Sequence, residues 1–198
     1  MIMPAIQPRI ILASASPRRA ELLKQIGVEF ELAPSQIEER PHPDEAPGDY
    51  ITRIARAKVI AVARGRDAGL VIGADTVVVL DGRMIGKPQN KADAHRLLRQ
   101  LSGKWHAVLT GVALYDVETR HEVADYEKTL VKFAQLNDAE IEWYVNTGEP
   151  MDKAGAYGIQ GLGGLFVDEI AGNYYNVVGL PIPLVYRLAR RLGYSFVP

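Results

Sequence analysis

Short apolar runs and longer amphipathic stretches alternate along this chain, which is typical of strands followed by helices. The clearest strand, Leu70–Leu80, is rich in β-branched residues and ends at an Asp-Gly pair that favours a tight turn. Other strands are expected at residues 9–13, 28–33, 105–116, 121–129 and 131–134, with a further pair at 164–170 and 173–178. Helices are expected at residues 17–26, 49–64, 92–101, 137–145 and 181–192, the fourth beginning with a capping box. This order predicts an α/β fold with a mixed sheet.

The composition is that of a folded globular domain, and we expect one domain over residues 1–198. Acidic and basic residues nearly cancel, 24 against 23, so no bulk charge attracts nucleic acid or membrane. The absence of cysteine excludes disulfides and thiol nucleophiles. The first nine residues lack the layout of a secretory signal, and no apolar run approaches membrane-spanning length, so we expect a cytoplasmic protein.

A candidate anion site lies where the first strand meets the first helix. Ser14 and Ser16 precede Pro17, and Arg18 and Arg19 follow it. Free N–H groups at a helix start favour an anion, and paired guanidinium groups match phosphate oxygens. The alternative is a capped helix with solvated arginine side chains.

Asp75 interrupts an apolar strand. A lone buried carboxylate there would cost several kcal/mol unless it is paired or bound to a cation. We therefore expect Asp75 at a strand end, or at a bend that Gly73 permits, as a metal ligand or as a general base for water. The alternative is an aspartate that accepts backbone hydrogen bonds at a turn.

Further charged residues could complete such a site. Lys87 follows the Asp81-Gly82 turn, and Lys58 lies on the helix expected over residues 49–64, where a solvated position is the alternative. Glu38 and Glu39 follow the second strand, and carboxylates near phosphate-binding bases suit Mg²⁺. Since Lys87 shares a strand and turn with Asp75, we expect Lys87→Ala to impair turnover more than Lys58→Ala.

The stretch from residue 151 to 161, MDKAGAYGIQG, has three glycines within eleven residues. Glycine permits sharp bends and close approach of backbone to a ligand, although a plain surface loop is the alternative. Neither a P-loop nor a nucleophile elbow is present, and the four histidines have no metal-ligand spacing. The remaining groups suit polyphosphate binding and attack by water, chemistry that depends on positioning and charge neutralisation.

Taken together, the short motifs of this chain resemble the Maf family of nucleotide pyrophosphatases. They occur in family order: LASASPRR at 12–19, GADT at 73–76, GKP at 86–88, LSG at 101–103, DKAGAYGIQG at 152–161 and VGLP at 178–181. The resemblance implies an elongated mixed sheet with two lobes around a cleft, as in inosine-triphosphate pyrophosphatases. It also implies a cytoplasmic homodimer that uses Mg²⁺ or Mn²⁺ to split a nucleoside triphosphate into monophosphate and pyrophosphate.

The same resemblance implies roles for individual residues. Asp75 would be the proton acceptor and a metal ligand, and Lys87 would be catalytic beside it. Glu39 would be the second metal ligand, although its neighbour Glu38 is also a candidate. The expected substrate-binding residues are Ser14, Arg18, Arg19, Lys58, Thr76, Lys153 and Gln160.

Three of these positions sort the family by substrate. Arg18, Thr76 and Gln160 match the branch acting on dTTP and UTP, whereas the branch acting on 7-methyl-GTP has Trp, Gln and Glu there. Gln160 offers a donor and an acceptor, which suits the imide edge of uracil or thymine. Modified pyrimidine triphosphates would be further house-cleaning substrates.

Two other functions stay open from the sequence. The chain could be a nucleotide-binding regulator of cell division or septum formation in which hydrolysis is incidental. It could also be a phosphate-binding module without catalysis, in which Asp75 is a structural turn residue.

Overall fold

A computed structural model describes residues 9–196 of the chain. The prediction that no secretory signal is present used the first nine residues, and all of these except Arg9 lie outside the described part of the chain. Along the first part of the chain the elements are β1 (Ile10–Leu12), α1 (Pro17–Gln25), β2 (Phe30–Leu32), α2 (Pro47–Ala63), β3 (Leu70–Leu80), β4 (Arg83–Ile85) and α3 (Lys91–Leu101). They are followed by β5 (Trp105–Asp116), β6 (Glu122–Phe133), α4 (Asp138–Asn146), β7 (Val167–Ala171), α5 (Tyr174–Val178) and α6 (Ile182–Arg191). Three short 3₁₀ helices, η1 (Glu149–Asp152), η2 (Ala154–Ala156) and η3 (Leu162–Phe166), lie between α4 and β7.

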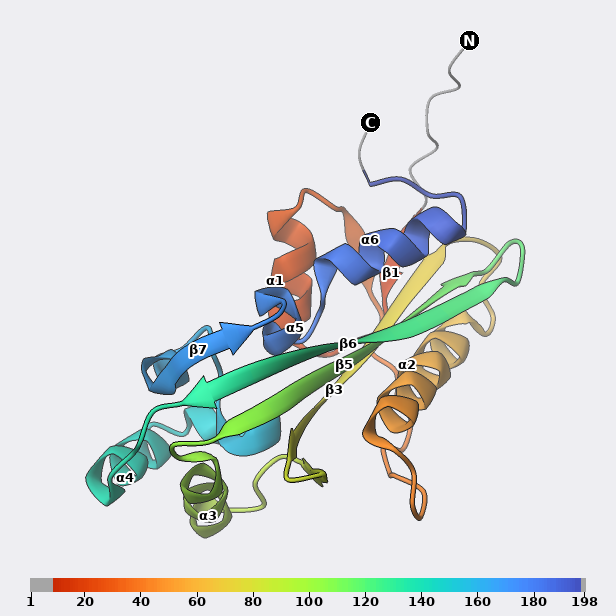
Figure 1. Ribbon diagram of the computed structural model, residues 1–198. Coiled ribbons are helices and arrows are strands. Elements are labelled where there is room, and N and C mark those ends of the chain that lie inside the picture. Colours follow the sequence, from red (N-terminus) through yellow and green to blue (C-terminus); the bar gives the residue numbers. More distant parts are fainter. Residues whose placement is uncertain (1–8, 197–198) are drawn as a thin grey trace. The chain divides into compact units, whose positions relative to one another are not determined.

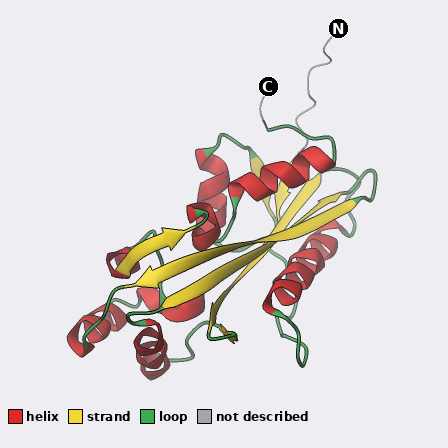
Figure 2. Cartoon of the chain, in the orientation of Figure 1, coloured by secondary structure: helices red, strands yellow, loops and turns green. Residues whose placement is uncertain are grey.

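The strands form a mixed sheet, as predicted (Figures 1 and 2). Within residues 9–196 the sheet has seven strands in the order β2-β1-β3-β5-β6-β7, with β4 paired to β3. β1 runs parallel to β2 and β3, whereas β4 runs antiparallel to β3 and β7 antiparallel to β6. The expected α/β class, with helices flanking a mixed sheet, is therefore confirmed.

The chain divides into two compact units, and β3, β5 and β6 each contribute to both. The first unit contains residues 9–75, 110–127 and 179–196 of the described chain. In this unit α2 covers one face of the strands and α6 the other (Figure 1). Ile11, Val71 and Ala113 of three strands pack with Ala55 and Val59 of α2. This packing fixes the position of α2 against β3.

The second unit contains residues 76–109 and 128–178. Its core joins the second half of β3 with α3, α4 and the segment after α4, and includes Leu98, Phe133, Tyr144 and Tyr157. Phe133 and Tyr157 contact edge to face, with ring centroids 4.6 Å apart. The Gly-rich stretch thus contributes buried side chains to this core, which the sequence did not suggest.

Three expected strand assignments differ from the structure. The strands expected at residues 121–129 and 131–134 form one continuous strand, β6, which runs from Glu122 to Phe133. The strand expected at residues 164–170 begins later than predicted, because Leu162–Phe166 is the 3₁₀ helix η3 and β7 starts at Val167. The expected strand at 173–178 is wrong, because Tyr174–Val178 is the helix α5. The side chain of Asn173 accepts a hydrogen bond from the N–H of Tyr175 at 2.9 Å, which favours a helical turn over the strand expected from the β-branched residues.

Candidate active site

The buried ion pair between Lys58 and Asp75 is the centre of the candidate site. Lys58 Nζ lies 2.8 Å from Asp75 Oδ1, and the two side chains are only 7% and 10% exposed. Lys58 Nζ also donates to the carbonyl oxygen of Ala74 at 3.2 Å. The sequence suggested that Lys58 could be a solvated helix residue, but the packing of α2 on β3 buries it.

Asp75 lies in the middle of β3, so the expectation of a strand end or bend is wrong. Gly73 has a different role from the one expected, since a Cβ there would lie 2.8 Å from Val59 Cγ1 and 2.9 Å from the carbonyl oxygen of Ala55. The missing side chain lets α2 approach β3 closely. That close approach brings Lys58 to Asp75, and the carboxylate is paired rather than placed at an open turn.

Glu39 contacts the same ammonium group. Its Oε1 atom lies 2.8 Å from Lys58 Nζ, whereas Glu38 pairs with Arg40 at the surface. The structure therefore separates the two adjacent glutamates and brings Glu39 to the cluster. We call Glu39, Lys58 and Asp75 the Lys58 cluster.

Ser14 and Arg19 lie beside this cluster. Arg19 is buried and donates to the carbonyl oxygens of Gly179 and Ala74, at 2.7 and 2.8 Å, and to Ser14 Oγ at 3.2 Å. Burial lowers the pKa of Arg19, and the charges of Asp75 and Glu39 oppose this shift. Arg19 thus ties α1 to β3 and to the segment before α6, an internal role that sequence reasoning missed.

Ser14 Oγ accepts two hydrogen bonds, from Arg19 and from the N–H of Ser16 at 3.1 Å. A hydroxyl group has two acceptor lone pairs and one donor, so these contacts do not use its proton. Ser14 can therefore donate to a phosphate oxygen at the start of α1. Arg18, on the same helix, is only partly buried.

The Lys58 cluster has the donor chemistry for a cation that arrives with its substrate. The described residues contain no group of three or more His, Cys, Asp or Glu side chains that could hold a metal ion alone. Mg²⁺ commonly binds through one or two carboxylates and the phosphates of its substrate, and Glu39 and Asp75 supply that number. The residues present therefore fit a metal ion bound together with a triphosphate.

Tyr50, near the start of α2, is a further residue that the sequence did not single out. Burial raises its pKa to about 12, and the charges of Asp75 and Glu39 add to the shift. Tyr50 is therefore a neutral hydroxyl within electrostatic range of the cluster. Nothing in the sequence could have identified Tyr50 as a neighbour of the site, because an aromatic residue near a helix start is common and indicates no particular function.

The other predicted site residues lie in the second unit. Lys87 follows β4 and is exposed, Thr76 continues β3, and Gln160 is exposed in the Gly-rich stretch. The N–H of Gly155 donates to the carbonyl oxygen of Gly86 at 3.0 Å, which joins the Gly-rich stretch to the Gly86-Lys87-Pro88 motif. The structure thus brings together two motifs that are far apart in the sequence.

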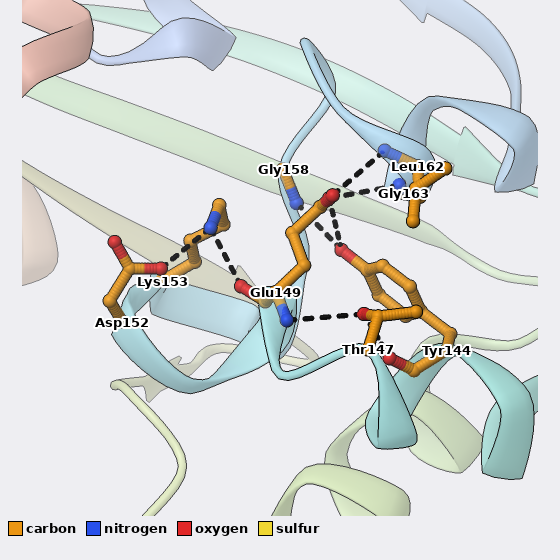
Figure 3. Close-up of polar contacts among 8 residues, drawn as sticks. All are labelled: Tyr144, Thr147, Glu149, Asp152, Lys153, Gly158, Leu162 and Gly163. Carbon is orange, nitrogen blue, oxygen red and sulfur yellow. Dashed lines mark hydrogen bonds and ion pairs between the residues drawn. The ribbon is translucent and has the colours of Figure 1, made fainter.

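Lys153 has internal partners. Its ammonium group donates to the carbonyl oxygen of Glu149 and to Asp152 Oδ1, each at 2.6 Å, and its side chain is 15% exposed (Figure 3). These contacts pair Lys153 with Asp152 and with the backbone of Glu149 within the loop. The substrate contact of Lys153 stays a prediction.

The described residues contain no helix that is long and apolar enough to cross a membrane.

Comparison with known proteins gives consistent relatives. The chain is 52% identical over 185 residues to a dTTP/UTP pyrophosphatase of Geobacter sulfurreducens, and the alignment covers 93% of this chain and 97% of that protein. It is 51% identical over 193 residues to the dTTP/UTP pyrophosphatase of Anaeromyxobacter dehalogenans strain 2CP-1, covering 94% and 95%. A solved HAM1 protein from Coxiella burnetii aligns with 66% of this chain and 75% of its own at a TM-score of 0.47 and 16% identity.

The profile of the Maf family, described as Maf-like protein, matches residues 9–192. This match spans both structural units and includes the Lys58 cluster and the Gly-rich stretch. By this match, and by its identity with these relatives, the chain belongs to the Maf family.

Proposed function

We propose that this protein hydrolyses dTTP and UTP to the nucleoside monophosphate and pyrophosphate. The Lys58 cluster carries the proposal, because it places a buried carboxylate beside cationic and hydroxyl groups suited to phosphate. The relatives named dTTP/UTP pyrophosphatase, at about half identity over nearly the full chain, support this choice of substrate.

Asp75 is the general base in this proposal. It accepts a proton from a water molecule that attacks the α-phosphorus, and pyrophosphate leaves with the bridging oxygen. The hydrogen bond from Lys58 holds the carboxylate in one orientation, so the base is positioned before substrate arrives. Lys87 would also be catalytic, a role that stays a prediction.

Binding of the triphosphate uses the start of α1. Ser14 donates its hydroxyl proton to a phosphate oxygen, and Arg18 adds a guanidinium group from the first turn of the helix. Arg19 holds Ser14 in place. A divalent cation, Mg²⁺ or Mn²⁺, would be held by Glu39 and Asp75 and would neutralise charge on the phosphates.

Base recognition is assigned to Thr76 and Gln160, together with Arg18. Gln160 is exposed and can present both a donor and an acceptor to uracil or thymine. We also propose a cytoplasmic location and a homodimer; the resemblance to the Maf family is the support for both.

The test is a substrate panel. The purified protein is incubated with UTP, dTTP, CTP and 7-methyl-GTP in the presence of Mg²⁺ or Mn²⁺, and released pyrophosphate is measured. We expect UTP and dTTP to be preferred. Turnover of 7-methyl-GTP without turnover of UTP would overturn the substrate assignment, and no pyrophosphate from any nucleotide would overturn the proposed activity.

A further inference from the structure

A partly buried hydrogen-bond network links the end of the Gly-rich stretch, and the residues that follow it, to Tyr144 of α4 and to Glu149. We call it the Glu149 brace: the side chains of Tyr144 and Glu149 with the N–H groups of Gly158, Leu162 and Gly163 (Figure 3). All of these residues belong to the second unit. The brace lies outside the Lys58 cluster, and the proposed chemistry does not use it.

The Glu149 carboxylate accepts three hydrogen bonds. Leu162 N–H donates to Oε2 at 2.9 Å, and Gly163 N–H donates to Oε1 at 3.1 Å. The Tyr144 hydroxyl donates to Oε1 at 2.8 Å and itself accepts from Gly158 N–H at 3.2 Å. One carboxylate and one phenol thus satisfy three backbone donors, one within the Gly-rich stretch and two directly after it.

The ionised form of Glu149 matches these contacts. Burial alone would raise its pKa, but the N–H groups of Leu162 and Gly163, the Tyr144 hydroxyl and the charge of Lys153 lower the pKa below its ordinary value. Tyr144 is buried, and burial with the bond to Glu149 raises its pKa. At neutral pH a charged acceptor therefore faces neutral donors.

Two glycines at the brace leave no room for side chains. A Cβ at Gly161 would lie 2.5 Å from Glu149 Oε2, and a Cβ at Gly163 would lie 2.5 Å from the Tyr144 hydroxyl oxygen. From the sequence we expected the glycine backbone to lie close to a ligand. At these positions it lies close to the side chains of Glu149 and Tyr144 instead.

Gln160 lies within the segment that the brace fixes. The N–H of Gly161 donates to the carbonyl oxygen of Gly158 at 3.2 Å and closes a turn around Ile159 and Gln160. Gly158 before this turn and Leu162 after it are both bound to the brace. The backbone of Gln160 is therefore held from both sides while its side chain is exposed.

We propose that Glu149, acting with Tyr144, is a positioning residue that sets base selectivity by fixing the Gln160 turn. This inference rests on the proposed function, since Gln160 must face the base. A fixed turn holds the amide donor and acceptor of Gln160 in one orientation toward the pairing edge of the base. Cytosine has its donor and acceptor exchanged on that edge relative to uracil, so a fixed amide distinguishes the two bases.

Glu149→Gln is the first test variant. It keeps the size of the side chain but replaces one acceptor oxygen with an NH₂ group, which cannot accept from Leu162 or Gly163. Tyr144→Phe is the second variant and removes the partner of Gly158 N–H. Glu142→Gln, on the exposed side of α4, is the matched control.

The first measurement is amide hydrogen exchange without nucleotide, which does not depend on the proposed activity. We expect exchange to be about tenfold faster in Glu149→Gln at whichever of Leu162 and Gly163 faces the NH₂ group, since a lost hydrogen bond typically changes a local equilibrium by that factor. In Tyr144→Phe the faster amide is expected at Gly158. Exchange at wild-type rates in both variants would overturn the brace.

The second measurement compares kcat and KM for UTP and CTP, with inorganic tripolyphosphate as a base-free competitive inhibitor. We expect Glu149→Gln to raise KM for UTP and to lower the ratio of kcat/KM between UTP and CTP by about tenfold. Inhibition by tripolyphosphate should not change, because it has no base.

The outcomes separate the two proposals. If the wild-type protein does not hydrolyse UTP, the proposed function fails while the exchange data still decide the brace. If kcat falls equally for UTP and CTP at an unchanged ratio, the brace is only structural and the selectivity role is overturned. If Glu149→Gln does not fold, as judged by its melting curve, the same ratio in Tyr144→Phe decides.

Discussion

Lys58 and Asp75 form a buried ion pair, with 2.8 Å between Nζ and Oδ1, at the point where α2 crosses the middle of β3. Glu39 contacts the same ammonium group from an exposed loop. One lysine thus links a buried carboxylate and a more accessible one. This arrangement suits a base that must be fixed and a ligand that must exchange.

Asp75→Asn should abolish most of the hydrolysis while nucleotide binding persists. Loss of a general base typically costs about 10²–10⁴-fold in rate, and the amide keeps the shape of the side chain. Pyrophosphate release from UTP and equilibrium binding of UTP measure the two effects. Asp67→Asn, an exposed aspartate of the same unit, is the control. A mutant with wild-type turnover would show that Asp75 is structural.

Lys58→Met should destabilise the fold. The methionine fills the apolar part of the lysine site but leaves Asp75 buried without its cation, which typically costs about 3–5 kcal/mol. Denaturant unfolding of the variant measures this loss, with Lys24→Met, at an exposed position of α1, as the control. Adding Asp75→Asn should recover part of the stability, because the unpaired charge is removed. A purely additive double mutant would contradict the coupling.

The order of two lysine variants should be the reverse of the order expected from the sequence. Lys58 contacts both carboxylates, whereas Lys87 is exposed after β4. We therefore expect Lys58→Ala to lose more turnover of UTP than Lys87→Ala. Initial rates at saturating UTP compare them, and the larger loss in Lys87→Ala would favour the original expectation.

Glu39→Gln should raise the Mg²⁺ concentration needed for half-maximal activity, while Glu38→Gln should not. Glu39 is joined to the Lys58 cluster, but Glu38 is paired with Arg40 at the surface. Carboxylates bind Mg²⁺ much better than neutral amides do. Metal titrations of UTP hydrolysis in the two variants make a matched comparison, and equal shifts would argue against Glu39 as a ligand.

His106 should make the fold less stable in mild acid. Burial lowers its pKa from 6.5 to about 4, so the unfolded chain takes up a proton first as the pH falls. The stability is then fully present above pH 6.5 and is lost as pH falls towards 4, by about 3 kcal/mol in total. The ring Nε2 contacts the Tyr157 hydroxyl at 2.8 Å, which His106→Gln could retain.

Denaturant unfolding at several pH values tests this dependence. The loss of unfolding free energy at low pH should be smaller in His106→Gln than in the wild type. His121 is exposed, so His121→Gln should behave as the wild type does. If His106→Gln loses as much stability at low pH as the wild type, the loss is caused by other groups.

Gly73→Ala should destabilise the protein by about 1–3 kcal/mol, because its Cβ has no space between β3 and α2. Gly86→Ala is the control, since a Cβ there would meet no atom within 4 Å. Thermal unfolding compares the two. Equal melting temperatures would show that α2 can move away from β3 without cost.

Much of the fold could be predicted from local patterns. The ranges of β3 and β5 agree with the expected strands, and the capping box of Asn137 and Glu140 begins α4 as expected. These signals are local, since apolar periodicity and cap chemistry act within a few residues. The prediction of a strand at residues 173–178 was wrong because a few β-branched residues cannot outweigh the helix-capping hydrogen bond of the Asn173 side chain.

The amino-acid sequence was enough to predict the α/β class, the family and the set of charged residues available to the site. Which of these residues meet depends on the folded chain: Glu39 rather than Glu38 joins Lys58, and Lys58 is buried against Asp75 in mid-strand. The structure also showed that Glu149 anchors the stretch that carries Gln160. These contacts depend on how closely α2 packs on β3 and how the Gly-rich backbone packs on α4. Such distances are set by packing between segments that are remote in sequence.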